Sequence, residues 1–292
     1  MKKKKYFAAI NSWVLGGFDG SRDAFQCIDS AAAFGLDGIE LTVGDVVPAD
    51  AKEKFCKKVR DYAAAKKICL RTVATGASWN LRLSDPCDKK RAEAVEWTKK
   101  YLQIAAWFGA EAALVIPGVV NAGWDPNCPI TPAKTVWRQS TRSMWDLLGT
   151  AEKLNVAVAC ENVWGKFLPD PFAMKAFLDQ FDSPYIGAYL DVANCLNVGY
   201  PQDWVEILGK RIKGIHFKNW KSEDFGGGLH GFGDDITVGE ADFPAILKAM
   251  DAVGYTGPVT LEMIPFSRLP DMVLPDLKLA KKTAKQLLAV LS

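Results

Sequence analysis

Four residues that can bind a metal ion each stand in or directly after a short apolar run. They are Glu161 after residues 156–160, Asp191 after residues 186–190, His216 within residues 212–217 and Glu262 after residues 258–261. A lone charge at the end of a buried strand is costly unless it is paired or binds a metal. Two glutamates, one aspartate and one histidine suit a hard-to-borderline divalent cation. The sequence therefore predicts one divalent metal site. The alternative is four ordinary strand-end charges in contact with water.

The four apolar runs have the character of strands that are covered on both faces by helices. Four further runs precede them in the chain, at residues 6–10, 38–41, 68–73 and 112–116. Helical patterns alternate with the eight runs, at residues 22–34, 48–67, 86–108, 131–154, 171–181, 201–208, 243–253 and 270–291. Eight strand–helix repeats without a linker predict an α/β fold, a (β/α)8 TIM barrel forming a single domain over residues 1–292. The metal-binding candidates would then meet at the C-terminal ends of the strands.

Composition argues against several classes of protein. The chain has 292 residues and a formal net charge of +2, with no basic stripe, so we expect no nucleic-acid partner. No apolar run reaches membrane-spanning length, so we expect no membrane partner. The apolar run after the lysines at residues 2–5 stops at Asn11, which is short for a secretion signal. We therefore expect a cytoplasmic protein, and a homo-oligomer remains an open alternative to a monomer.

The cysteines also favour a reducing compartment. All 7 are scattered and none forms a Cys-x-x-Cys pair, which is typical of free thiols rather than of a disulfide framework or a zinc site. Cys160 directly precedes Glu161 on the expected strand. Alternation along the strand therefore predicts that the Cys160 side chain faces the surrounding helices and takes no part in the chemistry.

Several short segments carry a further pattern, namely residues 37–41, 108–112, 190–194, 199–201 with Trp204, 215–218, 254–257 and 261–262. Together they resemble the sugar phosphate isomerase/epimerase family of xylose isomerase-like barrels. The resemblance implies that Glu161, Asp191, His216 and Glu262 form the single divalent site of the ketose 3-epimerase branch. That site usually holds manganese, with cobalt, magnesium and zinc as alternatives. The implied partner is a small sugar or sugar phosphate.

The resemblance implies a metal-dependent isomerase that removes a proton next to a carbonyl group. The divalent ion would polarise that carbonyl and stabilise the enediolate. Inversion at carbon 3 of a ketose needs two bases, one on each face of that carbon. Glu161 and Glu262 come from strands that are separated by the strands of Asp191 and His216. We therefore expect Glu161 and Glu262 to be the catalytic pair as well as metal ligands.

Five residues near the strand ends are candidates for substrate binding. They are Lys218, Asn194, Trp13, Glu40 and Trp124. Lys218 shares the strand face of His216, although a lysine at such a place is as often a solvated loop charge. Glu40 ends the second strand, where it could bind sugar hydroxyls or only form hydrogen bonds within the barrel mouth. The two tryptophans could line a sugar site or simply pack.

Three positions depart from the ketose 3-epimerase pattern. The resemblance leads us to expect an additional glutamate near residues 166–168, a histidine at Asn194 and an arginine at Ser222, and the chain has none of these. These positions contact the sugar in the family, so the identity of the substrate stays open. The Gly-rich segment 226–233 could close over the substrate or hold a phosphate.

Other functions share the same predicted site. An aldose–ketose isomerase or a lyase acting on a 3-keto-glycoside would abstract a proton in the same way. A barrel that binds metal and sugar without turnover is a further alternative. The DNA-repair branch of this barrel is excluded, since its three-metal site needs several histidines and the chain has 2.

Overall fold

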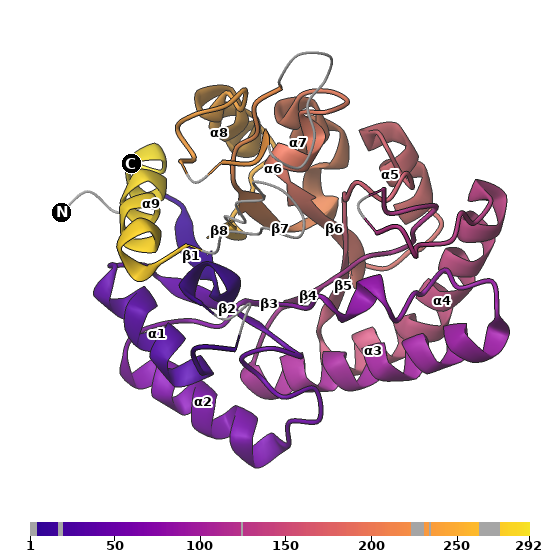
Figure 1. Cartoon of the computed structure of the whole chain (residues 1–292), viewed down its shortest axis with the longest axis horizontal. Helices are drawn as coiled ribbons and strands as arrows, with labels where there is room; N and C mark the ends of the chain where they lie inside the picture. The colour runs from indigo at the N-terminus through magenta and orange to yellow at the C-terminus, as the bar shows by residue number, and fades with distance from the viewer. Residues whose placement is uncertain (1–4, 17–19, 124, 223–230, 234, 263–274) are drawn as a thin grey trace.

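Eight parallel strands close into a barrel, and the helices surround it (Figure 1). The computed structural model describes residues 5–16, 20–123, 125–222, 231–233, 235–262 and 275–292. The strands are β1 Phe7–Asn11, β2 Gly38–Thr42, β3 Thr72–Ala74, β4 Ala112–Val115, β5 Ala157–Glu161, β6 Ile186–Asp191, β7 Ile212–Phe217 and β8 Pro258–Leu261. Their order in the barrel is their order in the chain, and β8 pairs with β1. The predicted (β/α)8 TIM barrel is therefore confirmed.

The helices follow the strands as the sequence predicts. They are α1 Ala24–Ala33, α2 Glu53–Ala65, α3 Asp88–Phe108, α4 Ala133–Leu154, α5 Pro171–Leu178, α6 Val192–Cys195, α7 Pro201–Leu208, α8 Phe243–Ala252 and α9 Leu277–Val290, with short 3-10 turns at η1 Ser12–Leu15, η2 Ala77–Trp79 and η3 Gly209–Arg211. Proline occupies the first turn of α5, α7 and α8, where its missing N–H costs nothing. Asp23 and Gln26 form a capping box that fixes the start of α1. Over the described residues, no helix is both long enough and apolar enough to span a membrane.

Some predicted boundaries differ from the structure. The third strand begins at Thr72 rather than residue 68, because Cys69 makes only an isolated bridge with Gly38. The second helix begins at Glu53 rather than residue 48. The last helix begins at Leu277, and part of the segment predicted to be helical before it lies outside the described residues. The one-turn helix α6 was not predicted, since Asp191 reads as the end of a strand.

Strand register places the polar residues of the barrel mouth beside one another. Asp191 on β6 is directly opposite His216 on β7. Asn11 on β1 is opposite Glu40 on β2. Because side chains alternate along a strand, Tyr189 faces inward two residues before Asp191. Alanine fills much of the barrel interior below them, in a buried cluster made of Ala74, Ala112, Leu114, Ala157, Ala159 and Tyr189.

Candidate metal centre

The four predicted metal ligands converge at the C-terminal ends of β5, β6, β7 and β8. One ligand atom from each of Glu161, Asp191, His216 and Glu262 lies within 4.8 Å of the others. Glu161 is 8% exposed and Glu262 is 4% exposed, while Asp191 and His216 are fully buried. Such burial is inconsistent with ordinary strand-end charges surrounded by water.

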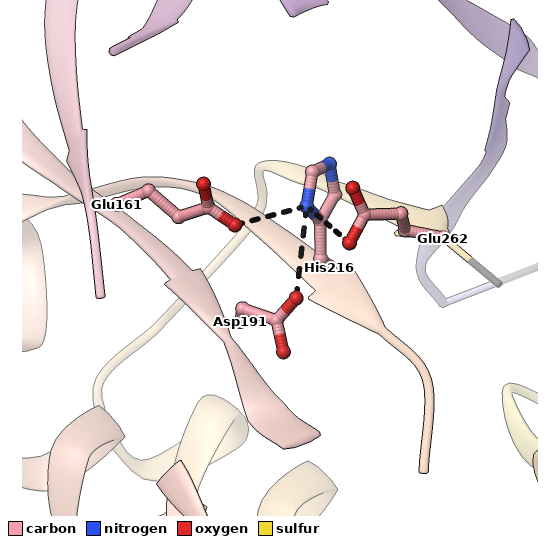
Figure 2. Close-up of side chains that lie close together, drawn as sticks. All are labelled: Glu161, Asp191, His216 and Glu262. Atoms are coloured by element: carbon pink, nitrogen blue, oxygen red, sulfur yellow. Dashed lines mark ion pairs between the residues drawn. The ribbon is translucent and has the colours of Figure 1, made fainter. Parts of the chain in front are cut away.

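The imidazole of His216 lies at the centre of the group (Figure 2). Its Nδ1 atom is 3.5 Å from Glu262 Oε2, 3.8 Å from Glu161 Oε1 and 3.9 Å from Asp191 Oδ2. The carboxyl groups of Glu161 and Glu262 approach the ring from opposite sides, and that of Asp191 lies between them (Figure 2). All three carboxylates thus face the same ring nitrogen.

Glu40 sets the orientation of that ring from the other side. His216 Nε2 is 2.7 Å from Glu40 Oε1, and Asn11 Nδ2 donates to the same oxygen at 2.7 Å. The Tyr189 hydroxyl donates to the second Glu40 oxygen. Burial raises the pKa of Glu40, but the charge and hydrogen bonds of His216 outweigh it and the pKa is lowered. An ionised Glu40 only accepts hydrogen bonds, so it holds a proton on His216 Nε2. Burial lowers the pKa of His216, but the neighbouring carboxylates outweigh this and raise it, so a cation that binds at Nδ1 must displace the second proton of the ring.

The contact between Tyr189 and Glu40 depends on a glycine. Gly214 shares the inward face of β7 with His216, and a Cβ atom there would lie 2.6 Å from the Tyr189 ring. The missing side chain leaves room for the phenol, whose ring centroid is 4.5 Å from that of His216. Sequence reasoning missed Tyr189 as part of the site. Its signal was a polar aromatic residue on the same strand face as Asp191.

Asp191 is fixed by the backbone that follows it and by Asn162, the residue directly after β5. Its Oδ1 atom accepts from the N–H groups of Ala193 and Asn194, both at 2.9 Å, and so caps α6. Asn162 donates to the Asp191 carbonyl at 2.9 Å and accepts from the Asp191 N–H at 2.7 Å. Only Oδ2 is then left for a ligand. Asn162 is a second residue that sequence reasoning missed.

Two buried atoms of the group have no hydrogen-bond partner, namely Asp191 Oδ2 and His216 Nδ1. Lys218 Nζ lies 2.7 Å from Asp191 Oδ2, but the two atoms are not aligned as a hydrogen bond. Asp191 Oδ2 is thus paired with a lysine, whereas His216 Nδ1 is a buried polar atom without a hydrogen-bond partner, which is rare and calls for an explanation such as an ion. Three carboxylates and an imidazole nitrogen that face one space are a donor set for a divalent cation. The residues present therefore fit a bound metal.

Burial and neighbouring charges shift the pKa of each carboxylate ligand. Burial raises the pKa of Glu161 to about 7, against the opposing effect of His216. Burial also raises the pKa of Asp191, although Lys218 opposes it. For Glu262 burial acts upward too, but the charges of Lys218 and His216 prevail and lower its pKa to about 2. The two glutamates thus have opposite shifts.

Lys218 is buried at the site rather than solvated, with 9% of the residue exposed. Its Nζ atom lies 2.6 Å from Glu262 Oε2 in addition to the contact with Asp191. The Phe232 ring lies on another side, with its centroid 5.0 Å from Nζ. Burial lowers the pKa of Lys218, but Asp191 and Glu262 outweigh this and raise it above its usual value. Lys218 therefore places a positive charge beside the ligand oxygens.

The other predicted substrate-binding residues have different surroundings. Glu40 is fully buried and both of its oxygens bond to protein, which favours hydrogen bonding within the barrel mouth over sugar binding. The Asn194 side chain donates to Asn162 O at 2.9 Å. Trp13 follows β1, and its indole N–H donates to Asp45 at 2.8 Å. Trp124 lies outside the described residues, as does most of segment 226–233.

Two of the positions that depart from the ketose 3-epimerase pattern have structural roles, one in packing and one in a hydrogen bond within a loop. Phe167 and Leu168 are buried, and Phe167 meets the ring of Phe177 edge-on at 5.7 Å. Ser222 is exposed and its N–H donates to Glu240 at 2.7 Å.

The Cys160 prediction concerned the direction of a side chain. Cys160 is fully buried, and its sulfur lies 4.0 Å from that of Met144 on α4. The side chain therefore faces the helices, and the prediction is confirmed.

Several solved structures share this fold across nearly their whole length. L-ribulose 3-epimerase has a TM-score of 0.78 at 17% identity, with 98% of this chain and 94% of that chain covered. D-psicose 3-epimerase from Clostridium cellulolyticum H10, solved with D-tagatose, has a TM-score of 0.77 at 17% identity over 97% of this chain and 96% of that chain. The 3-keto-D-glucoside 4-epimerase from E. coli has a TM-score of 0.73 at 12% identity over 97% and 99%.

No curated protein sequence matches the chain. The family model described as "Xylose isomerase-like TIM barrel" matches residues 28–289, which is most of the sequence. The chain belongs to the xylose isomerase-like TIM barrel family.

Proposed function

We propose that the protein is a divalent-metal-dependent sugar epimerase that inverts carbon 3 of a ketose. The observation that carries this proposal is the placement of Glu161 and Glu262 on opposite sides of His216 (Figure 2). Two carboxylates that face each other across a cation-binding group can reach the two faces of one substrate carbon. The ketose 3-epimerases among the similar structures support the same class of reaction.

Glu161, Asp191, His216 and Glu262 would hold the cation. A set of three carboxylates with one imidazole suits a hard-to-borderline divalent cation. We propose Mn²⁺, as the resemblance to the ketose 3-epimerase branch implies, with Co²⁺, Mg²⁺ and Zn²⁺ as alternatives. When bound, the cation supplies Lewis-acid stabilisation of the negative charge that develops on the substrate oxygens.

The two glutamates move the protons. The first takes the proton from carbon 3, which is acidified by the neighbouring carbonyl group, and becomes a neutral acid. The second begins as a neutral acid and delivers its proton to the opposite face of the same carbon. One proton leaves and one arrives, so the sugar changes configuration without a change in composition. General acid–base catalysis of this kind contributes about 10²–10⁴ in rate.

The surrounding residues orient the substrate. Lys218 has an ammonium group beside Glu262 and can contact a substrate oxygen. Trp13 and Asn194 lie at the ends of β1 and β6, where a sugar at the barrel mouth would meet them. We propose these three as substrate contacts, and we assign Glu40 to the orientation of His216 instead.

A second candidate is proton transfer on a 3-keto-glycoside. It is favoured by the residues at the positions that contact the sugar in ketose 3-epimerases. Here Phe167 and Leu168 are buried, and the N–H of Ser222 bonds to Glu240. One of the similar structures is a 3-keto-D-glucoside 4-epimerase. The same glutamates would then act at a carbon next to the carbonyl at carbon 3.

One experiment distinguishes these candidates. The Mn²⁺-loaded protein is incubated in D2O with free ketoses, ketose phosphates and 3-keto-glucosides, and the products are read by NMR. We expect deuterium at carbon 3 of a ketose together with its epimer. Deuterium next to the keto group of a 3-keto-glucoside, with none in any ketose, would favour the second candidate. No exchange in any sugar would contradict both and favour a binding protein without turnover.

A further inference from the structure

Lys218 contacts the same carboxylate oxygens that face the cation-binding space. Its Nζ atom is 2.7 Å from Asp191 Oδ2 and 2.6 Å from Glu262 Oε2. Those two oxygens are the ones nearest to His216 Nδ1 on their respective carboxylates. An ammonium group and a metal ion would therefore compete for the same two ligand atoms.

The lysine is built into the site. Lys218 follows His216 by two residues, so both side chains extend from the same face of the chain. Its position is closed on another side by Phe232, whose backbone pairs with Trp220 in an isolated bridge. The position of Lys218 in the chain and the packing of Phe232 thus hold the ammonium group against the carboxylates.

The charges explain why such a group is needed. Glu161, Asp191 and Glu262 are three acids in a buried space, and an uncompensated buried carboxylate is strongly destabilising. Glu40 already pairs with His216. Lys218 contacts two of the three ligand carboxylates directly, in addition to the His216 ring that faces all three.

We propose that Lys218 is an internal counter-cation that occupies part of the metal site in the metal-free protein and sets the metal affinity by competing with the divalent ion. The inference rests on the proposed metal site and not on the reaction that the site catalyses. Metal binding must displace the ammonium group from Asp191 Oδ2 and Glu262 Oε2. The free energy of this displacement lowers the metal affinity. In the metal-free protein the same ammonium group stabilises the buried carboxylates.

The test compares Lys218→Met with the wild-type protein. Methionine is also unbranched, is one atom shorter than lysine and removes its charge. Lys213→Met is the matched control, because Lys213 is on the same strand but near its other end, where its side chain lies against Gly187 and away from the metal ligands. Mn²⁺ affinity is measured by titration calorimetry on the chelator-treated full-length chain, at one pH and ionic strength, and thermal melts are recorded with and without Mn²⁺.

We expect Lys218→Met to bind Mn²⁺ at least about tenfold more tightly, which corresponds to ~1.4 kcal/mol. Its metal-free form should melt at a lower temperature, and Mn²⁺ should raise that temperature by more than it does for the wild type. Lys213→Met should keep the wild-type affinity. Unchanged or weaker Mn²⁺ binding by Lys218→Met would overturn the inference, since it would mean that the lysine only holds the carboxylates in place.

A second measurement applies if the Lys218 variant folds only when metal is bound. Lys218→Met and Lys218→Gln are then purified with Mn²⁺, and affinity is obtained by competition with a chelator. Both should release Mn²⁺ at higher chelator concentrations than the wild type, and release at the same or lower concentrations would contradict the inference. Absence of Mn²⁺ binding in the wild type would instead contradict the proposed metal site itself.

Discussion

His216 Nε2 lies 2.7 Å from Glu40 Oε1, and this contact turns the Nδ1 atom of the same ring toward three carboxylates. The two residues are 176 positions apart in sequence and meet only because the barrel closes. Carboxylate–histidine–metal arrangements of this kind fix the tautomer and raise the basicity of the ligand. Glu40 is therefore a positioning residue for the metal site.

Replacing Glu40 by glutamine tests this role. The substitution keeps the shape but removes the charge that fixes the proton on His216 Nε2. We expect Mn²⁺ affinity to fall about 10–100-fold, as is typical for such partners. Glu111→Gln is the control, because Glu111 pairs with Arg71 away from the site. Wild-type Mn²⁺ affinity in a folded Glu40→Gln protein would show that Glu40 does not orient the ligand.

Cys160→Ser tests the separation between the two faces of β5. Burial raises the pKa of Cys160 to about 12, so the side chain is a neutral thiol packed near Met144. A serine hydroxyl there lacks a partner, and we expect a loss of about 1–3 kcal/mol in the free energy of unfolding. Mn²⁺ stoichiometry and activity should stay near those of the wild type. A folded, metal-loaded but inactive variant would contradict the orientation of this side chain.

Asp235 lies outside the metal site and makes the free energy of unfolding depend on pH. Hydrogen bonds from Thr237 are the main cause that lowers its pKa; Gln286 and Lys282 add to the effect. A depressed folded-state pKa stabilises the protein above the unfolded pKa of about 4, and this stabilisation is lost as the pH falls through the folded value. Asp235→Asn should therefore lower the free energy of unfolding by about 1–2 kcal/mol at pH 7.

The pH profile of the difference is the check on Asp235. Denaturant unfolding of both proteins should give a constant difference above about pH 5, and the difference should shrink below about pH 4. A difference that stays the same from neutral to acidic pH would mean that the charge of Asp235 contributes nothing.

The barrel and its four metal-ligand candidates were readable from the sequence for a specific reason. Each carboxylate ligand directly follows an apolar run and His216 lies near the end of another, and parallel strands bring such ends to one edge. The direction of Cys160 followed from alternation alone. These features depend on local pattern and on one rule of topology.

The supporting contacts were not readable, because they depend on register and on side-chain direction. Tyr189 and Glu40 are 149 positions apart, and their contact requires the space left by Gly214. Asn162 follows β5 and forms hydrogen bonds with the backbone of Asp191 at the end of the neighbouring strand β6. The helix α6 could not be predicted from the sequence, because Asp191 both ends β6 and caps the helix that follows.

Deuterium exchange by glutamine variants of Glu161 and Glu262 tests the two-base account most directly. Each Mn²⁺-loaded variant is incubated in D2O with each epimer of the sugar that the wild type converts, after its metal content has been verified. We expect inversion to fall by at least about 10² in both variants. Each should still exchange the carbon 3 proton of one epimer only, and the two variants should select opposite epimers. A metal-loaded Glu262→Gln protein that inverts the sugar at nearly the wild-type rate would contradict the two-base mechanism and leave Glu262 as a ligand alone.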